Sequence, residues 1–383
     1  MSTAHVPETS AETSRRRAPR WFGDFWRRLS DGLELQQLWD QFRSEARTSY
    51  DLYRVDVDEE DLGRIRGPRG WFRVVRAWFW AIVMKLAPAR RVLLVVALMM
   101  GWFGDLRFVI RGATIELNFL GWGFLLLVVL LVLELADRVT MKRDLEIARE
   151  IQRWLVPEEA PQVPGIDIGF ATRPANTVSG DYYDAFLLDH EERRLLLAVA
   201  DVAGKSVPAA LLMASFHACL HSCARDCDGP ESLAARLNEF GCTRSLDGQR
   251  FTTAFLAELD LASRTLRYVN AGHNPPVLQR RDGGAERLEH GGLPFGVDAG
   301  ARYQSGTVTL APGDLLFIFT DGLVDAVDAA GNHYGDPRVL DDLRTLPALS
   351  AAATIRALVA NVERFAGGTR QSDDITCLAL HVE

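Results

Sequence analysis

The sequence predicts an α+β fold for the C-terminal part of the chain, preceded by apolar helices. Apolar runs of strand length lie at residues 195–200, 315–319 and 375–382. A longer apolar run at residues 209–220 has the length of a helix. The uncharged run at residues 117–133 has 17 residues, close to the minimum of about 17 to 25 that crosses a bilayer. We therefore expect a membrane region followed by a folded domain.

Length and composition exclude few classes of protein. The chain has 383 residues, of which 48% are apolar and 25% charged, as in ordinary folded proteins. Its formal net charge is -8, and the basic residues form no stripe in the C-terminal part, so we expect no nucleic-acid binding. All nine tryptophans lie between Trp21 and Trp154, which makes the N-terminal part chemically distinct.

The first 86 residues fall into two segments. Residues 1–20 carry Ser, Thr, Pro and Arg without the apolar core of a signal peptide, so we expect a disordered tail. Residues 21–86 alternate aromatic and basic side chains. This pattern fits two structures equally: amphipathic helices on an anionic membrane surface, or a small packed helical module.

We expect a transmembrane region over residues 87–134, with helices at about 88–104 and 117–134. The first apolar run is shorter, so a single crossing beside a re-entrant or packed segment is the alternative. Basic residues before the first run and after the second place both ends in the cytoplasm. The prediction is a multi-pass protein of the inner (cytoplasmic) membrane, with residues 105–116 as a short external loop and the C-terminal domain in the cytoplasm.

Residues 135–157 predict a helical linker that leaves the membrane and ends at Pro157. Apolar and small residues recur there at alternating spacings of four and three, from Met141 to Leu155, which is a weak coiled-coil pattern. Two interpretations remain open. The helix packs on its own domain, or it pairs with its copy in a homodimer and passes a signal to the domain.

Acidic side chains recur where the expected strands begin or end. They are, in chain order, Asp181, Asp184, Asp201, Asp321, Asp325, Asp373 and Asp374. Asp201 directly follows the run at residues 195–200, and Ser206 is suited to cap the helix that comes next. A carboxylate at the end of a buried strand is costly to desolvate unless it is hydrogen-bonded or binds a cation.

Carboxylates that converge repel one another unless divalent cations neutralise them, and ligands that are all oxygen favour Mg²⁺ or Mn²⁺. Two such ions about 3.5 to 4 Å apart lower the pKa of a water and aim it at a phosphorus atom. If the aspartates converge, the predicted chemistry is therefore phosphoester hydrolysis, with Asp201 as the central catalytic residue.

The five cysteines do not suggest a disulfide framework. Cys219, Cys223 and Cys227 fall four residues apart on the expected helix, with His217 and His221 nearby. A metal site is one interpretation, and a helix face with buried, reduced thiols is the other.

Seven segments, taken in order, resemble the SpoIIE/RsbU-type bacterial branch of the PPM (protein phosphatase 2C) serine/threonine phosphatases. They are VSGDYYDAF, VADVAGKSVPAALLMA, FTTAFLAELD, YVNAGHNPPVL, LPFGV, FTDGLVDA and SDDIT. The upstream segment AREIQRWLVP is similar to the helical linker before that domain. For residues 158–383 the resemblance implies a PPM-type β-sandwich of two antiparallel sheets flanked by helices, with a two-metal centre at one end.

Matching motif positions imply a role for each acidic residue of that centre. Asp201 would bridge both metals, and the carbonyl of Val202 would assist one of them. Asp181 would act at the first motif. Asp321 and Asp373 would complete the shell of the second metal.

Four further residues have roles implied less directly. Asp325 matches an acidic position that binds a looser third metal in some relatives, and Asp184 and Asp374 would support the ligands from behind. His273 lies in the segment NAGHNPP. It is either a general acid or part of a hairpin turn, and the neighbouring Asn and Pro residues favour the turn.

The resemblance implies a membrane-anchored, metal-dependent protein serine/threonine phosphatase with two Mn²⁺ or Mg²⁺ ions and a third, weaker ion. It would hydrolyse phosphoserine or phosphothreonine on a regulatory phosphoprotein, which in this family is often an anti-sigma-factor antagonist, without a phosphoenzyme. One alternative is a catalytically silent, membrane-tethered signalling scaffold, against which the retained aspartates argue. Hydrolysis of a small nucleotide is another alternative.

Overall fold

A computed structural model describes residues 83, 86–110, 113–189, 193–204, 206–244, 250–346, 350–369 and 371–383. The expected tail at residues 1–20 and nearly all of the expected region at 21–86 lie outside these residues. The chain divides into two compact units, Met1–Leu135 and Ala136–Glu383.

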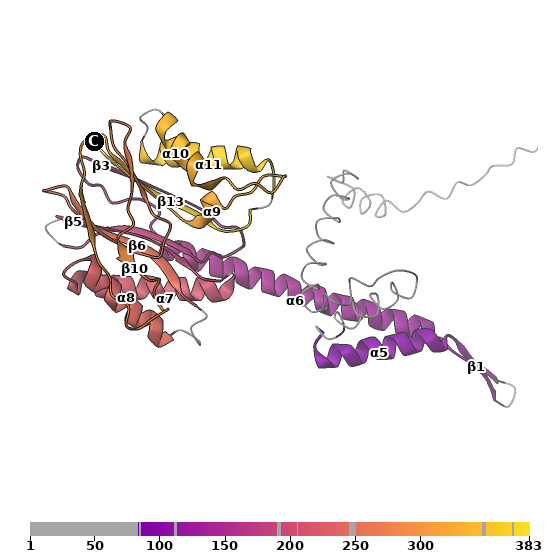
Figure 1. Cartoon of the computed structure of the whole chain (residues 1–383). Helices are drawn as coiled ribbons and strands as arrows, with labels where there is room; N and C mark the ends of the chain where they lie inside the picture. Colours follow the sequence, from indigo (N-terminus) through magenta and orange to yellow (C-terminus); the bar gives the residue numbers. More distant parts are fainter. Residues whose placement is uncertain are drawn as a thin grey trace, which may run out of the picture. The chain divides into compact units, whose positions relative to one another are not determined.

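In the first unit, helix α5 (Pro88–Phe103) lies alongside the first part of helix α6 (Phe119–Leu155) (Figure 1). A Cβ atom on Gly123 would lie 2.9 Å from the carbonyl oxygen of Ala97, so glycine at this position allows the two helices to touch. Arg90 of α5 forms an ion pair with Glu134 of α6 at 3.0 Å. The two helices therefore form an antiparallel pair.

Between these helices the structure corrects the expected loop. Residues 105–116 contain most of an antiparallel hairpin formed by β1 (Leu106–Ile110) and β2 (Ala113–Leu117).

Helix α6 is long and apolar enough to cross a membrane by length and composition. It has 37 residues and an 18-residue window of mean hydropathy 2.5, of which 6% is buried. The segment Val207–Asp226 passes the same test, but it packs on a sheet of the second unit, which accounts for its apolar side chains. Helix α5 has only 16 residues.

The second unit is a sandwich of two sheets flanked by helices, as the sequence predicts (Figure 1). The first sheet has the order β10-β7-β6-β5-β4, with β11 also paired to β7, and the second has the order β3-β13-β12-β8-β9. All pairs are antiparallel except β10 with β7. The strands are β3 (Ile166–Arg173), β4 (Asp181–Leu187), β5 (Arg194–Val202), β6 (Thr252–Asp260), β7 (Thr265–Ala271), β8 (Val277–Gln279), β9 (Ala285–Arg287), β10 (Gly291–Gly292), β11 (Gly306–Thr309), β12 (Leu315–Phe319) and β13 (Ile375–Val382).

Helices cover the outer face of each sheet and create three apolar layers. One layer lies between the first sheet and its helices, the second lies between the two sheets, and the third lies under the helices of the second sheet. The helices are α7 (Val207–Cys223) and α8 (Pro230–Arg244) on the first sheet, and α10 (Gly335–Thr345) and α11 (Ala351–Ala366) on the second. The short helices η1 (Ala224–Asp226) and α9 (Asp321–Val324) lie between longer elements.

The layer between the sheets changes from apolar to polar at one end. In β5, Leu195, Leu197 and Val199 pack between the sheets, and the next residue on that face is Asp201. Thr253 lies opposite Asp201 in the β5–β6 register. Four neighbouring strands make the same change from aliphatic to polar side chains, at Asp181, Thr253, Thr320 and Thr376. One end of the sandwich is therefore lined with oxygen atoms.

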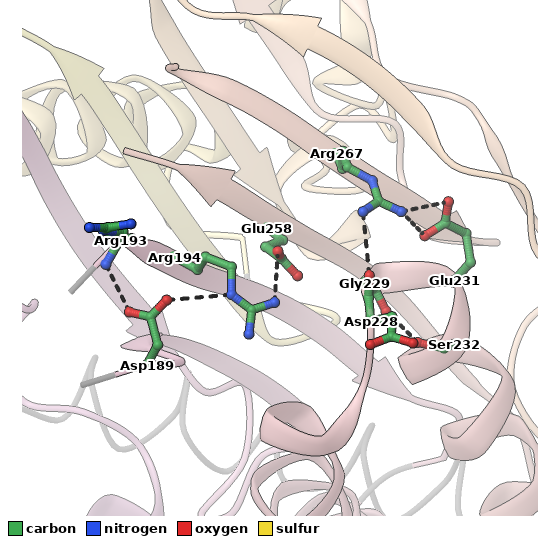
Figure 2. A network of polar contacts seen from close by, with 9 residues as sticks. All are labelled: Asp189, Arg193, Arg194, Asp228, Gly229, Glu231, Ser232, Glu258 and Arg267. Atoms are coloured by element: carbon green, nitrogen blue, oxygen red, sulfur yellow. Dashed lines mark hydrogen bonds and ion pairs between the residues drawn. The ribbon is translucent and has the colours of Figure 1, made fainter. Parts of the chain in front are cut away.

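Figure 2 shows how arginines fix the first sheet to its surroundings. Arg194 of β5 contacts Glu258 of β6 at 3.2 Å. Arg267 of β7 donates to both carboxylate oxygens of Glu231 on α8, at 3.1 and 2.9 Å, and to the Asp228 carbonyl at 3.4 Å. Such partly exposed pairs contribute less than about 1 kcal/mol each. The first joins two strands of the sheet, and the second joins β7 to α8.

The individual elements agree closely with the sequence. The runs at residues 195–200, 315–319 and 375–382 are β5, β12 and β13, and the helix expected to end before Pro157 ends at Leu155. Two details were wrong. Ser206 precedes α7 but its side chain makes no capping hydrogen bond, and α7 ends at Cys223, so Cys227 lies beyond the helix.

Candidate metal centre

Asp181 and Asp201 are the innermost members of the acidic cluster. They lie directly opposite each other on the neighbouring strands β4 and β5, at the polar end of the layer between the sheets. Asp181 is only 6% exposed. Its carboxylate accepts a hydrogen bond from the hydroxyl of Thr320 at 2.9 Å, which comes from the end of β12 in the opposite sheet. The two sheets therefore meet at this carboxylate.

The electrostatics of this pair show that further carboxylates are close. Burial raises the pKa of Asp201 to about 7, together with repulsion from Asp321, Asp373 and Asp374. Burial raises the pKa of Asp181 as well, and the charge of Asp201 adds to that effect. Aspartates from four separate motifs thus repel one another within one small region.

A pocket of about 260 Å³ opens beside Asp201, whereas Asp181 lines a separate pocket next to Gln152 and Ser179. The lining of the first pocket includes Asp201, Asp321 and Asp373, with Val202 and Thr253 next to them. The available donors are carboxylate, hydroxyl and carbonyl oxygens, which suit hard divalent cations such as Mn²⁺ or Mg²⁺. Cations in this pocket would relieve the repulsion that raises the two pKa values, so the residues present fit such ions.

Asp374 does not compete for this pocket, because its carboxylate is used in holding two loops together. It accepts hydrogen bonds from the amide of Ala175 at 2.7 Å, the hydroxyl of Ser179 at 2.7 Å and the amide of Gly180 at 3.0 Å. Asp374 thereby joins the segment before β4 to the segment before β13. That it supports metal ligands from behind stays a prediction.

Two glycines permit the close approach of these segments. A Cβ atom on Gly180 would lie 3.0 Å from the carbonyl oxygen of Val202. A Cβ atom on Gly322 would lie 2.0 Å from the carbonyl oxygen of Asp374, a distance that no side chain tolerates. Gly322 therefore allows the start of α9, which carries Asp321, to lie against the segment that carries Asp373.

Two of the predicted site residues have other neighbours. Asp325 is exposed at the C-terminal end of α9, where it contacts His333 at 3.6 Å. Asp184 lies on the opposite face of β4 from Asp181, where its carboxylate contacts Tyr182 and His221. The structure thus does not bring Asp184 to the pocket that Asp201 lines.

His273 lies in the connection between β7 and β8, which belong to different sheets, so the expected hairpin turn was wrong: the segment crosses from one sheet to the other, and His273 lines the same pocket. The ring is buried, and its Nδ1 atom lies 3.2 Å from the hydroxyl of Thr253. Burial lowers the pKa of His273 to about 4, so the imidazole is neutral near pH 7. A neutral ring is a weak proton donor, which argues against a general acid.

No sequence pattern indicates the contact made by Gln152. This residue lies in the last turns of α6, and its side-chain amide pairs with both backbone groups of Ser179. The amide of Ser179 donates to Gln152 Oε1 at 3.0 Å, and Gln152 Nε2 donates to the Ser179 carbonyl at 2.7 Å. Ser179 Oγ in turn contacts Asp374 and accepts the amide of Asp181. Gln152 therefore connects the linker helix to two of the aspartates.

Comparison with known proteins gives the following matches. A family model described as stage II sporulation protein E (SpoIIE) matches residues 191–383. The phosphoserine phosphatase RsbU of Bacillus subtilis is 32% identical over 186 residues, which cover 48% of this chain and 54% of RsbU. Protein IcfG of Synechocystis is 29% identical over 284 residues, 66% of this chain and 43% of IcfG. The chain thus spans about half the length of the curated relatives it matches.

Solved structures show the same fold. The SiaA-PP2C domain of Pseudomonas aeruginosa superimposes with a TM-score of 0.59 at 22% identity, over 65% of this chain and 99% of that domain. The PP2C phosphatase domain and regulatory fragment of SpoIIE from Bacillus subtilis give a TM-score of 0.51 at 21% identity, over 57% of this chain and 62% of that one.

We expect Gln152→Ala to weaken Mn²⁺ binding by roughly 2- to 10-fold, because it removes two hydrogen bonds that hold Ser179 and, through it, Asp181. Electron paramagnetic resonance of free Mn²⁺, titrated against the full chain in detergent, measures this affinity. Glu150→Ala removes an exposed side chain of the same helix and serves as the control. An unchanged Mn²⁺ affinity in Gln152→Ala would show that the contact does not position the aspartates.

The raised pKa of Asp201 predicts how stability depends on pH when metal is removed. Its pKa of about 7 in the folded chain exceeds the ordinary value of 3.8, so the folded state binds more protons between these values. Stability is therefore lost as pH rises through that range. In EDTA we expect the melting temperature to fall from pH 6 to pH 8, and Asp201→Asn to raise it at pH 8.

With Mn²⁺ present the order should reverse, because Asp201→Asn then removes a ligand. Thermal unfolding followed by intrinsic fluorescence measures both effects. Asp226→Asn, at an exposed acid in η1, should show neither. A lower melting temperature for Asp201→Asn in EDTA at pH 8 would mean that the carboxylates do not repel as described.

Proposed function

Because the chain belongs to the SpoIIE family of PP2C-type phosphatases, we propose that it is a membrane-anchored, metal-dependent protein serine/threonine phosphatase. The observation that supports this most is the gathering of Asp181, Asp201, Asp321 and Asp373 at one end of the sandwich. These residues come from four motifs, and their mutual repulsion is costly without a function that uses it.

The residues that would hold two Mn²⁺ or Mg²⁺ ions are Asp181, Asp201, Asp321 and Asp373, with the carbonyl of Val202. Bound there, the ions would supply a more acidic water and positive charge for a phosphoryl group. The chain itself fixes the ligands: Thr320 holds one oxygen of Asp181. A third, weaker ion would use Asp325, which is exposed and so free of a large desolvation cost.

The lining of the pocket agrees with the proposal that the ions supply the positive charge and the chain supplies their ligands. Of the described residues that line it, none carries a permanent positive charge. Among these described residues a phosphate dianion would meet carboxylates and neutral groups, and bound cations would supply the attraction. Binding of a phosphomonoester and binding of divalent metal are thus expected to depend on each other.

For the substrate we propose phosphoserine or phosphothreonine on a regulatory phosphoprotein. RsbU is by name a phosphoserine phosphatase, and we extend that substrate class to this chain. An anti-sigma-factor antagonist is the class of protein that the family resemblance suggests. A phosphoproteome comparison of cells with wild-type and Asp201→Asn protein would identify the substrate.

The described helices support the proposal of a membrane anchor and of a homodimer. Helix α6 exposes large apolar side chains along its first half, among them Leu125, Leu131 and Val132. Beyond that stretch it exposes Ile147 and Ile151, one turn apart, which would suit a second copy of the helix. We propose that α5 and α6 form a two-helix anchor in the inner membrane, with the phosphatase domain in the cytoplasm.

The proposed activity is tested with the full chain in detergent, Mn²⁺ and two substrates, p-nitrophenyl phosphate and a phosphoserine peptide. We expect Asp201→Asn and Asp373→Asn each to lower kcat at least about 100-fold, because each removes a charged ligand of the metals. Asp226→Asn should retain activity. Wild-type turnover no higher than that of Asp201→Asn would instead favour the catalytically silent scaffold, and turnover of free nucleotides alone would favour nucleotide hydrolysis.

The proposed anchor predicts that the full chain stays in the membrane fraction after an alkaline carbonate wash. The double variant Leu127→Arg, Leu131→Arg should leave that fraction, since each arginine near the middle of a bilayer costs about 2.5 to 3.5 kcal/mol. Leu211→Arg alters an exposed residue of α7 and should have no such effect. Release of the wild-type chain by carbonate would contradict the anchor.

A further inference from the structure

A second group of polar side chains lies on the outer face of the first sheet, away from the acidic pocket. Asp184 projects from β4 towards α7, where His217 and His221 lie one turn apart. The carboxylate of Asp184 lies 2.7 Å from His221 Nε2 and 2.5 Å from the hydroxyl of Tyr182. That hydroxyl lies 3.1 Å from His217 Nδ1.

These side chains already converge. One ligand atom each from Asp184, His217 and His221 lies within 4.8 Å of the other two. Zinc in proteins binds imidazole and carboxylate at about 2.0 to 2.2 Å, so only small movements of these atoms are needed to surround an ion. The ring of Phe186 stacks on His221 at 4.3 Å and 19°, which holds the imidazole in place.

The charge balance of the group also points to a cation. Asp184 is 5% exposed, and a buried carboxylate is costly without a positive partner. Its partners are a phenol and an imidazole. The buried negative charge therefore lacks a permanent positive partner among the contacts of the described residues.

The nearby thiols are less well placed as ligands than these three residues. Among the described residues, the side chains that converge as a possible metal site are Asp184, His217 and His221, without a cysteine. Cys227 lies beyond the end of α7. Of the two interpretations of this helix, a metal site built from cysteines is thus the less favourable.

We propose that Asp184, His217 and His221 form a binding site for a transition-metal dication such as Zn²⁺, separate from the acidic pocket. Two imidazoles with one carboxylate favour zinc and its neighbours over Mg²⁺ or Mn²⁺, and three protein ligands leave a position for water. The ion joins β4, which begins with Asp181, to α7. Its binding stabilises the folded chain in proportion to the logarithm of its free concentration.

The experiment is a titration of Co²⁺, as a spectroscopic substitute for Zn²⁺, into the full chain purified in detergent without a polyhistidine tag. It is done in the Asp201→Asn background, where the acidic pocket has lost its central ligand. We expect one equivalent of Co²⁺ to give the visible absorption of a four- or five-coordinate site with nitrogen ligands, and Zn²⁺ to displace it. If the band is retained in this background, Co²⁺ binds at the outer site whether or not the chain is a phosphatase.

His221→Gln should remove this band or weaken Co²⁺ binding at least about 10-fold, since even indirect changes around metal ligands commonly cost that much. The His221 side chain is 40% exposed, so the substitution should leave the fold intact, which thermal unfolding in EDTA verifies. His290→Gln, at an exposed histidine of another strand connection, should retain the band. An unchanged spectrum and affinity in His221→Gln, or no visible band in the parent chain, would overturn the proposal.

Discussion

Repulsion between carboxylates at the polar end of the sandwich is the constraint on which the rest of the structure depends. Asp181 and Asp201 face each other across β4 and β5, and both have pKa values raised by burial. Repulsion between these carboxylates favours separation of the sheets at this end, and burial of the apolar layer between the sheets opposes it. The aliphatic core therefore supplies the free energy that keeps the acidic cluster assembled, and bound cations would return part of it.

Antiparallel pairing explains how residues far apart in the sequence reach one place. β4 and β5 are neighbours in the first sheet, and β12 and β13 are neighbours in the second. The segments after β5 and β12 and before β4 and β13 consequently open at the same end. Hydrogen bonds then fix the positions of these segments, because Asp374 holds the segments before β4 and β13 together.

The sequence predicts β5, β12 and β13 well because their runs are short and largely apolar and have acidic residues next to them. Asp181 and Asp184 are three residues apart, so on one strand they must point to opposite faces. The expected loop at residues 105–116 was wrong, although an Arg-Gly pair separates the two runs that form β1 and β2. The contact between Gln152 and Ser179 spans 27 residues, and no local pattern indicates it. Ser206 failed as a cap because its φ is 66°, outside the range usual for that position.

Strand β4 presents one face to each of the two proposed metal sites. Asp181 faces the layer between the sheets, next to Asp201 and Thr320, and Asp184, three residues later, faces α7. Helix α7 begins a few residues after Asp201, which lies on β5. The two sites are therefore joined by β4 and by the connection from β5 to α7. If an ion at Asp184, His217 and His221 changes the affinity of the acidic pocket for Mn²⁺, then Mn²⁺ must change the affinity of the outer site by the same factor.

Coupling of this kind needs a difference in the position of β4 or α7 between the two occupied states, because ligands that bind both states equally shift nothing. Tyr182 of the strand and Phe216 of the helix pack edge to face in the apolar layer under α7, so a difference in the position of one element would pass to the other through this contact.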